Sequence, residues 1–235
     1  MKRLAFFTFL IFASYTISAQ SYVELGGFLG IANYQGDLSQ DPIEFGATKF
    51  SVGGLVRYHY GPRLYFKGSV YAGQISGSDL NADPESGNFA RGWSMTSNLL
   101  EVTINAEWLP LAKTRFNDVG IFRAQINPYL FVGIGSNFSK PVVDWENGAT
   151  PAVGFPEEGS TRNFLVVPMG GGLRFDFTQW STLGFEAGWR YTNSDYIDGI
   201  SQNASGLSGN TKPDWYFFWG VTLSTYFGEQ EDFGL

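Results

Sequence analysis

The sequence contains no cysteine and a single histidine among its 235 residues. Without cysteine the chain can form neither disulfides nor thiolate metal sites, and it cannot carry a lipoprotein anchor. Charged residues are also scarce: they make up 16% of the chain, whereas about 25% is usual for soluble domains. The formal net charge of −7 argues against nucleic acid as a partner.

Long apolar runs are missing too, except at the N-terminus. There, two cations precede the apolar stretch Leu4–Ile17, and small residues stand before Gln20. This order predicts a secretory signal peptide over residues 1–19, cleaved near Ala19-Gln20. The remaining domain, 20–235, is then exported. The mean hydropathy of −0.10 excludes a bundle of membrane helices.

What the sequence has instead is aromatic side chains, at 17%, and 30 glycines. In most of eight segments, apolar and polar residues alternate with the period of two that indicates a β-strand. Each segment is long enough for the roughly 9–11 residues of a tilted strand that crosses a bilayer. The fold class is therefore all-β, and we predict an eight-stranded antiparallel up-and-down transmembrane β-barrel of the bacterial outer membrane. The predicted strands are 22–33, 49–60, 63–75, 96–108, 128–138, 163–177, 181–192 and 214–228.

The alternation assigns a lipid face to most strands. In 96–108 that face carries Leu100, Val102, Ile104, Ala106 and Trp108. Segment 128–138 is apolar on both faces, so its orientation stays open. Segment 214–228 is rich in aromatics, which at both of its ends suit the aromatic girdles of a barrel. Pairing of this segment with the first strand would leave no open sheet edge.

Charged residues on the opposite strand faces point into the predicted lumen, with both signs in similar number. An eight-stranded barrel is just wide enough to be filled by its own side chains, and charges there must be paired or hydrated. We therefore predict a structural network of ion pairs; an ion or proton path is the alternative. Its members are Glu24, Arg57, His59, Lys67, Glu101, Glu107, Arg174, Asp176, Glu186 and Arg190.

The connections between the strands alternate in length. Outer-membrane barrels have short periplasmic turns and long extracellular loops, and with both termini in the periplasm the long connections here lie outside. One connection, about 109–126, breaks this rule because it is long although it falls on the periplasmic side. Two interpretations stay open: the connection is a poorly ordered turn, or it contacts a periplasmic partner through Lys113, Arg115, Phe116, Asn117, Asp118 and Arg123.

Two stretches contain residue types that could form a catalytic site or a metal site. Some eight-stranded barrels are lipid-modifying enzymes that use a histidine with a serine and an acid, but His59 falls at the periplasmic end of its strand and no fixed spacing supports a triad. We interpret it as an interior structural residue. The spaced oxygen side chains of Asp79, Asn81, Asp83 and Glu85 suggest a calcium loop, yet the glycine and glutamate of an EF-hand are missing. We interpret 79–87 as a solvated loop. The sequence indicates no cofactor.

The stretches "YVELGGFLGIANYQGDLS" (22–39) and "LGFEAGWRYTNSDYIDGIS" (183–201), with "NPYLFVGIGSNF" and "VVPMGGGLRFDF" between them, carry a resemblance. Together they resemble the PorG-like family of small outer-membrane barrels of Bacteroidota, over essentially the whole mature chain. The pairing of "NYQGDL" with "DYIDGIS" is the distinctive part. The resemblance implies an outer-membrane anchor without enzymatic activity, which contacts a periplasmic ring of the type IX secretion and gliding apparatus.

The sequence and the resemblance favour a non-enzymatic barrel that anchors or organises a periplasmic envelope complex, most specifically a type IX secretion system. Two alternatives stay open. The chain could be a small adhesion or envelope-integrity barrel of OmpA or OmpX type that acts through its extracellular loops, or a lipid-modifying enzyme. The expected partners are outer-membrane lipid, lipopolysaccharide and periplasmic ring proteins.

Overall fold

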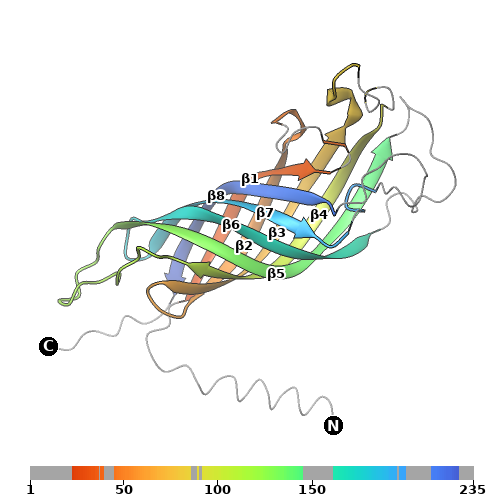
Figure 1. Ribbon diagram of the computed structural model, residues 1–235. Coiled ribbons are helices and arrows are strands. Elements are labelled where there is room, and N and C mark those ends of the chain that lie inside the picture. Colours follow the sequence, from red (N-terminus) through yellow and green to blue (C-terminus); the bar gives the residue numbers. More distant parts are fainter. Residues whose placement is uncertain are drawn as a thin grey trace, which may run out of the picture.

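The computed structural model describes residues 23–36, 38–39, 45–85, 89, 92–144, 161–194, 196–199 and 213–227. The predicted signal peptide lies outside these residues. Eight strands form one closed barrel in which each strand pairs with its neighbours in sequence, antiparallel throughout, and the last pairs with the first (Figure 1). The predicted fold class is therefore confirmed. No helix in the described residues is long and apolar enough to cross a membrane.

The strands agree closely with the predicted segments, with one exception. They are β1 (Val23–Gln35), β2 (Lys49–His59), β3 (Leu64–Ser78), β4 (Ser94–Trp108), β5 (Gln125–Asp144), β6 (Arg162–Asp176), β7 (Ser181–Thr192) and β8 (Trp215–Phe227), with 3-10 turns η1 (Phe45–Ala47) and η2 (Asp79–Asn81). The prediction for β5, 128–138, was too short. Pro141 suggests a strand end, but the pairing of β5 with β6 ends at Ser139. Beyond that point β5 is an edge strand, where proline is tolerated.

The two ends of the barrel differ, and we name them by their connections. The turn end carries the β2–β3, β4–β5 and β6–β7 connections, the start of β1 and the end of β8. The loop end carries the other connections. Around the barrel, the pairing that starts at Val23 returns to β1 at Asn33, a stagger of ten residues. A barrel of this strand number has an interior that side chains can fill.

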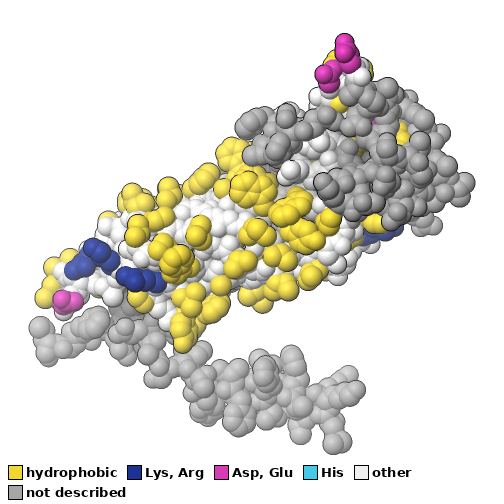
Figure 2. Space-filling model, viewed as in Figure 1, with side chains coloured by type: hydrophobic (Ala, Val, Ile, Leu, Met, Phe, Trp, Pro, Cys, Tyr) yellow, Lys and Arg dark blue, Asp and Glu magenta, His cyan; other side chains and the backbone are white. Residues whose placement is uncertain are grey.

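The faces of the strands follow the predicted alternation. Outward-pointing Val102 and Ile104 on β4 are 44% and 66% exposed, whereas inward Thr103 and Asn105 are each 2% exposed. The open orientation of β5 is also resolved, because Tyr129 points inward and is 2% exposed. Figure 2 shows the resulting apolar side chains spread over the outer wall. Such an outer face requires an apolar surrounding.

The aromatic strand β8 packs its outward rings against neighbours. Val221 and Leu223 are exposed outward, as predicted for its lipid face. Phe217 also points outward but is 7% exposed, because its ring lies 4.8 Å from the ring of Trp189 on β7. The pairing of β8 with β1 runs along the whole of both strands, Val23↔Phe227 to Gln35↔Trp215, so this aromatic strand has no open edge.

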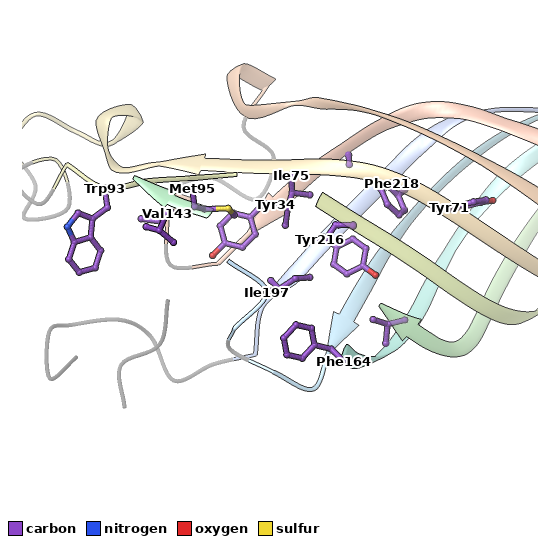
Figure 3. Packing of buried hydrophobic residues seen from close by; sticks show 14 of the residues in the cluster. Tyr34, Tyr71, Ile75, Trp93, Met95, Val143, Phe164, Ile197, Tyr216 and Phe218 are labelled. Atoms are coloured by element: carbon purple, nitrogen blue, oxygen red, sulfur yellow. The ribbon is translucent and has the colours of Figure 1, made fainter. Parts of the chain in front are cut away.

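The lumen has two layers, of which the sequence indicated only one. The turn-end half holds the charged residues. The loop-end half is filled by an apolar cluster of Phe28, Ala32, Tyr34, Leu38, Tyr71, Ile75, Trp93, Met95, Leu99, Val143, Phe164, Val166, Ile197, Tyr216 and Phe218. Figure 3 shows these side chains converging from several strands and from the loops. The barrel therefore has a hydrophobic core in addition to its ionic network.

Candidate functional site

The charged layer of the lumen brings all ten predicted residues together. Each of them points inward, and none is more than 6% exposed. Inward-pointing residues recur at every second position of a strand. Each charged side chain therefore meets side chains that other strands also direct into the lumen. The members are Glu24, Arg57, His59, Lys67, Glu101, Glu107, Arg174, Asp176, Glu186 and Arg190.

Glu24 on β1 is the hub at the turn end. Its carboxylate accepts hydrogen bonds from Arg57 at 2.8 Å and from Arg174 at 2.8 Å. The His59 ring nitrogen Nε2 lies 3.0 Å from Oε2, the oxygen that also accepts from Arg174, and the hydroxyl of Ser224 donates to Oε1. Four partners satisfy the lone pairs of this fully buried carboxylate, as a buried charge requires.

The network continues from Arg57 toward the middle of the barrel. The Arg57 guanidinium donates to Glu107 at 2.9 Å, and Glu107 lies 3.1 Å from Lys67. Lys67 in turn donates to Glu186 at 2.5 Å, and Glu186 also accepts the hydroxyl of Tyr129 at 2.9 Å. Each charge therefore has at least one partner of opposite sign, which is the arrangement of a structural network.

At the limit of the charged layer nearest the loop end, Arg190 lies between two carboxylates. Its guanidinium lies 3.4 Å from Glu101 and 4.0 Å from Glu186. Glu101 also accepts the hydroxyl of Tyr216 at 2.6 Å. Above this level the apolar cluster begins, and with it the lumen is closed to ions by apolar side chains.

The β4–β5 connection supplies one further cation, Arg115. Its guanidinium stacks 3.4 Å from the ring centroid of Tyr226 and donates to the carbonyl oxygens of Thr178 and Gln179 at 3.3 and 3.2 Å. It also lies 3.9 Å from Asp176. Only 8% of Arg115 is exposed. It is therefore a structural residue of the barrel floor, which corrects its predicted role as a contact residue.

With Arg115 the ionic layer becomes electrically balanced. The network has the five carboxylates Glu24, Glu101, Glu107, Asp176 and Glu186 and the four strand cations Arg57, Lys67, Arg174 and Arg190. Arg115 is the fifth cation. The connection therefore belongs to the barrel and completes its interior.

The first half of the connection also closes the turn end mechanically. Leu109 and Ala112 are buried against Tyr65, Tyr129 and Phe131 from the barrel wall. These side chains form a small apolar cluster that adjoins the ionic layer, since the Tyr129 hydroxyl bonds Glu186 and the Phe131 ring lies 4.7 Å from the Lys67 ammonium. Apolar side chains thus pack in the lumen in both halves of the barrel.

The second half of the connection is a stiff hairpin. Phe116 and Phe122 form a β-bridge, and their rings are 6.0 Å apart. The Asn117 side chain accepts hydrogen bonds from the backbone N–H groups of Val119 and Ile121, at 3.1 and 2.8 Å. Gly120 has φ +78°, a conformation that favours glycine. Phe116 and Asn117, predicted as contact residues, therefore hold the hairpin in shape.

The tip of this hairpin is apolar and exposed. Val119 is 75% exposed, Ile121 63% and the nearby Leu111 67%. The other predicted contact residues, Lys113, Asp118 and Arg123, are exposed around them, and Figure 2 shows the charged side chains beside apolar ones at this end. The sequence reasoning named the charges and missed the three apolar residues. The turn "NDVG" (117–120), which contains Val119 and is flanked by Phe116 and Ile121, was the signal for the hairpin tip.

His59 does not form a catalytic triad in this structure. Its ring stacks on Tyr65 with a centroid distance of 3.7 Å, and its Nε2 faces Glu24. The hydroxyl of Ser224 donates to the same carboxylate. In a triad the histidine stands between serine and acid, whereas here the glutamate stands between serine and histidine. His59 is interior and structural in this geometry.

The residues of the suggested calcium loop point in different directions. The Asp79 carboxylate is 1% exposed and accepts the backbone N–H of Trp93 at 3.1 Å. The Asp83 carboxylate is exposed and accepts the backbone N–H of Glu85 at 3.0 Å. In the described part of the chain no group of three or more such side chains could hold a metal ion.

The two distinctive motifs of the sequence meet at the loop end. Tyr34 of "NYQGDL" donates its hydroxyl to Asp198 of "DYIDGIS" at 2.5 Å. Leu38 and Ile197 from the same motifs pack in the apolar cluster, and the backbone N–H of Ile197 donates to Asp214 at the start of β8. This clasp, formed by Tyr34, Leu38, Ile197, Asp198 and Asp214, joins the first and last loops over the core.

Comparison with known proteins agrees with this architecture. The model of one protein family, a domain of unknown function (DUF6089), matches residues 2–234. No curated protein matches the chain in sequence.

The similar solved structures are outer-membrane proteins. A major outer membrane protein of Thermus thermophilus has 13% identity and a TM-score of 0.50, over 89% of this chain and 100% of that one. Neisserial surface protein A has 13% identity and a TM-score of 0.49, over 89% and 98%. The β-barrel domain of Pseudomonas aeruginosa OprF has 14% identity and a TM-score of 0.42, over 88% and 97%. At these identities the likeness shows the fold alone.

Proposed function

The chain belongs to the DUF6089 family of domains of unknown function, and we propose that it is a non-enzymatic outer-membrane barrel that anchors a periplasmic envelope complex. The resemblance to PorG-like proteins of Bacteroidota makes a type IX secretion system the specific candidate. The turn end then faces the periplasm, and the outer wall contacts lipid and lipopolysaccharide.

The outer wall supports the membrane part of this proposal. Leu29, Ile104, Leu130 and Leu173 point outward from four strands and are each more than half exposed. In water, such a surface would be an aggregation hazard. In a bilayer it matches the apolar band of outer-membrane barrels.

The stiff hairpin with its apolar tip is the observation that carries the anchoring role. Exposed apolar side chains on a preformed element lose little conformational entropy when they bind. Val119 and Ile121 lie in the β4–β5 connection, outside the strands, and are not packed into the core. Flanking Lys113 and Arg123 add positive charge. These features suit an apolar groove with an acidic rim on a periplasmic protein.

The filled lumen favours an anchoring role rather than the role of a channel. An apolar cluster fills the loop-end half, and a neutral ionic layer with a small apolar cluster fills the turn-end half. An ion would have to leave water and pass both. The same closure gives the interior charges a structural role in place of an ion path.

Replacement of the apolar tip tests the proposal. The double variant Val119→Asp/Ile121→Asp should reduce recovery of periplasmic partners in affinity purification at least about tenfold, because a few central apolar residues carry most binding energy and about 1.4 kcal/mol is tenfold. The control Leu80→Asp changes a 47%-exposed residue at the other end of the barrel. Both variants must keep resistance to SDS without heating, as folded barrels do.

Three outcomes of this experiment distinguish the anchor from the adhesion barrel. Loss of partners in the tip variant alone supports the anchor. Equal recovery from the wild type and the tip variant contradicts it. If Leu80→Asp instead abolishes recovery, the loops carry the binding, as in the alternative of an adhesion barrel. The exposed carboxylates Asp83 and Glu85 in the β3–β4 connection favour that alternative, and Figure 2 shows acidic side chains gathered at one end of the molecule.

A further inference from the structure

A group of buried polar side chains lies above the ionic layer on the β4–β5 side of the lumen. Ser97, Asn137 and Ser139 point inward and are each 0% exposed. Within the described part of the chain, the hydroxyls of Ser97 and Ser139 make no hydrogen bond, and the Asn137 amide makes none of good geometry although it lies near the Tyr216 hydroxyl. The same holds for one carboxylate oxygen of Glu101. The function proposed above uses none of these groups.

These groups are neighbours on the barrel wall. Asn137 is directly opposite Glu101, and Ser139 is opposite Leu99. Ser97 precedes Leu99 by two residues on β4, so it lies diagonally across from Ser139. Diagonal side chains on one sheet face start about 7–8 Å apart. A serine hydroxyl extends only about one bond beyond its Cβ atom, so the two hydroxyls do not reach each other, and the remaining gap suits a bridging water.

An unpartnered buried polar group costs about 1–3 kcal/mol, and native interiors satisfy most such groups. Several adjacent ones therefore need partners from outside the chain. Apolar side chains such as Ile75 and Phe164 line the same level of the barrel and supply none. A buried water with two to four polar neighbours is the usual solution.

The charges favour water over a cation. Glu101 already has Arg190 at 3.4 Å and accepts the hydroxyl of Tyr216. The other three groups are neutral, and each can both donate and accept. A cation here would lie near Arg190, and the adjacent carboxylate of Glu101 already balances that arginine. Water meets the donors and acceptors without adding charge.

We infer that Ser97, Asn137, Ser139 and the second oxygen of Glu101 form a binding site for a small cluster of buried waters. The cluster continues the hydrogen-bonded network from Arg190 along the β4–β5 wall, beside the apolar core. It lies inside the filled lumen, and its waters exchange slowly with the bulk.

A crystal structure of the full chain in detergent, at a resolution that resolves water, tests this site. We expect water density within hydrogen-bond distance of both the Ser97 and Ser139 hydroxyls. NMR should detect water cross-peaks at the amides of residues 97, 137 and 139. No density, or side chains turned to bond one another directly, overturns the inference.

A matched pair of variants sharpens the test. Ser97→Ala/Ser139→Ala removes two ligands and should lose at least one water and its cross-peaks; Ser139→Ala alone serves if the double variant does not fold. Ser69→Ala is the control because the Ser69 hydroxyl bonds Thr103 directly at 2.8 Å. The control should keep the density, and unchanged water density in the double variant contradicts the site.

Discussion

At the scale of single residues, Glu24 determines whether the charged layer holds together. It accepts hydrogen bonds from two arginines and a serine, and His59 faces it. Removal of one partner from a buried ion pair leaves an uncompensated charge, which is strongly destabilising. The same substitution on the surface has little effect.

Glu24→Ala should therefore lower the free energy of unfolding by about 3–5 kcal/mol. The control is Glu85→Ala, at an exposed loop position, which should stay within about 0.5 kcal/mol of the wild type. Urea unfolding in detergent micelles or liposomes, followed by tryptophan fluorescence, measures both. A loss below about 1 kcal/mol for Glu24→Ala would mean that the network contributes little to stability.

The sequence predicted the position of single residues correctly where the alternation with a period of two showed which face of a strand they occupy. All ten network residues, nine charged ones and His59, were assigned to the lumen because an inward position on a strand is visible in the alternation. Arg115 was misassigned because it lies in a connection, where no period exists. Its burial depends on Tyr226 from β8, which is distant in sequence and close only in the closed barrel.

At the scale of elements, the β4–β5 connection does two tasks. Its first part closes the barrel floor through Leu109, Ala112 and Arg115. Its second part projects as the hairpin with the exposed tip. The length of the connection was visible in the sequence, but the division of its residues between floor and tip was not.

Arg115→Met should separate these tasks. It removes the stacking on Tyr226 and two hydrogen bonds from a cation, so we expect a loss of about 2 kcal/mol in the free energy of unfolding. Trypsin should also cleave the hairpin faster at Lys113. Arg123→Met, an exposed cation of the same hairpin, should change stability by less than about 0.5 kcal/mol. Equal effects of the two variants would contradict the role of Arg115 in the floor.

Element boundaries show the same limits of sequence reading. The start of β5 at Gln125 and its end at Asp144 lie outside the predicted 128–138. Near its end the outward residues are mixed, since Phe138 and Val142 are apolar whereas Lys140 and Asp144 are polar. Such a mixed face gives no clear strand signal when only one strand is considered.

At the scale of the whole molecule, the barrel separates an apolar outer wall from an interior that holds a charge-balanced ionic layer and an apolar core. The sequence predicted the wall because apolar and polar residues alternate in most of the strands. It did not predict the apolar core of the loop-end half, since that core joins loop residues such as Leu38, Trp93 and Ile197 to strand residues. Contacts between loops have no periodic signal.

The central claim is that the barrel is embedded in lipid and that its turn-end hairpin binds a periplasmic protein. Photo-crosslinking in living cells, with a photoreactive amino acid placed in turn at Val119, Val102 and Leu80, tests both parts at once. We expect Val119 to capture a defined periplasmic protein, Val102 to capture lipid, and Leu80 to capture neither of these. Absence of a protein adduct at Val119, or capture of the same protein from all three positions, would contradict the account.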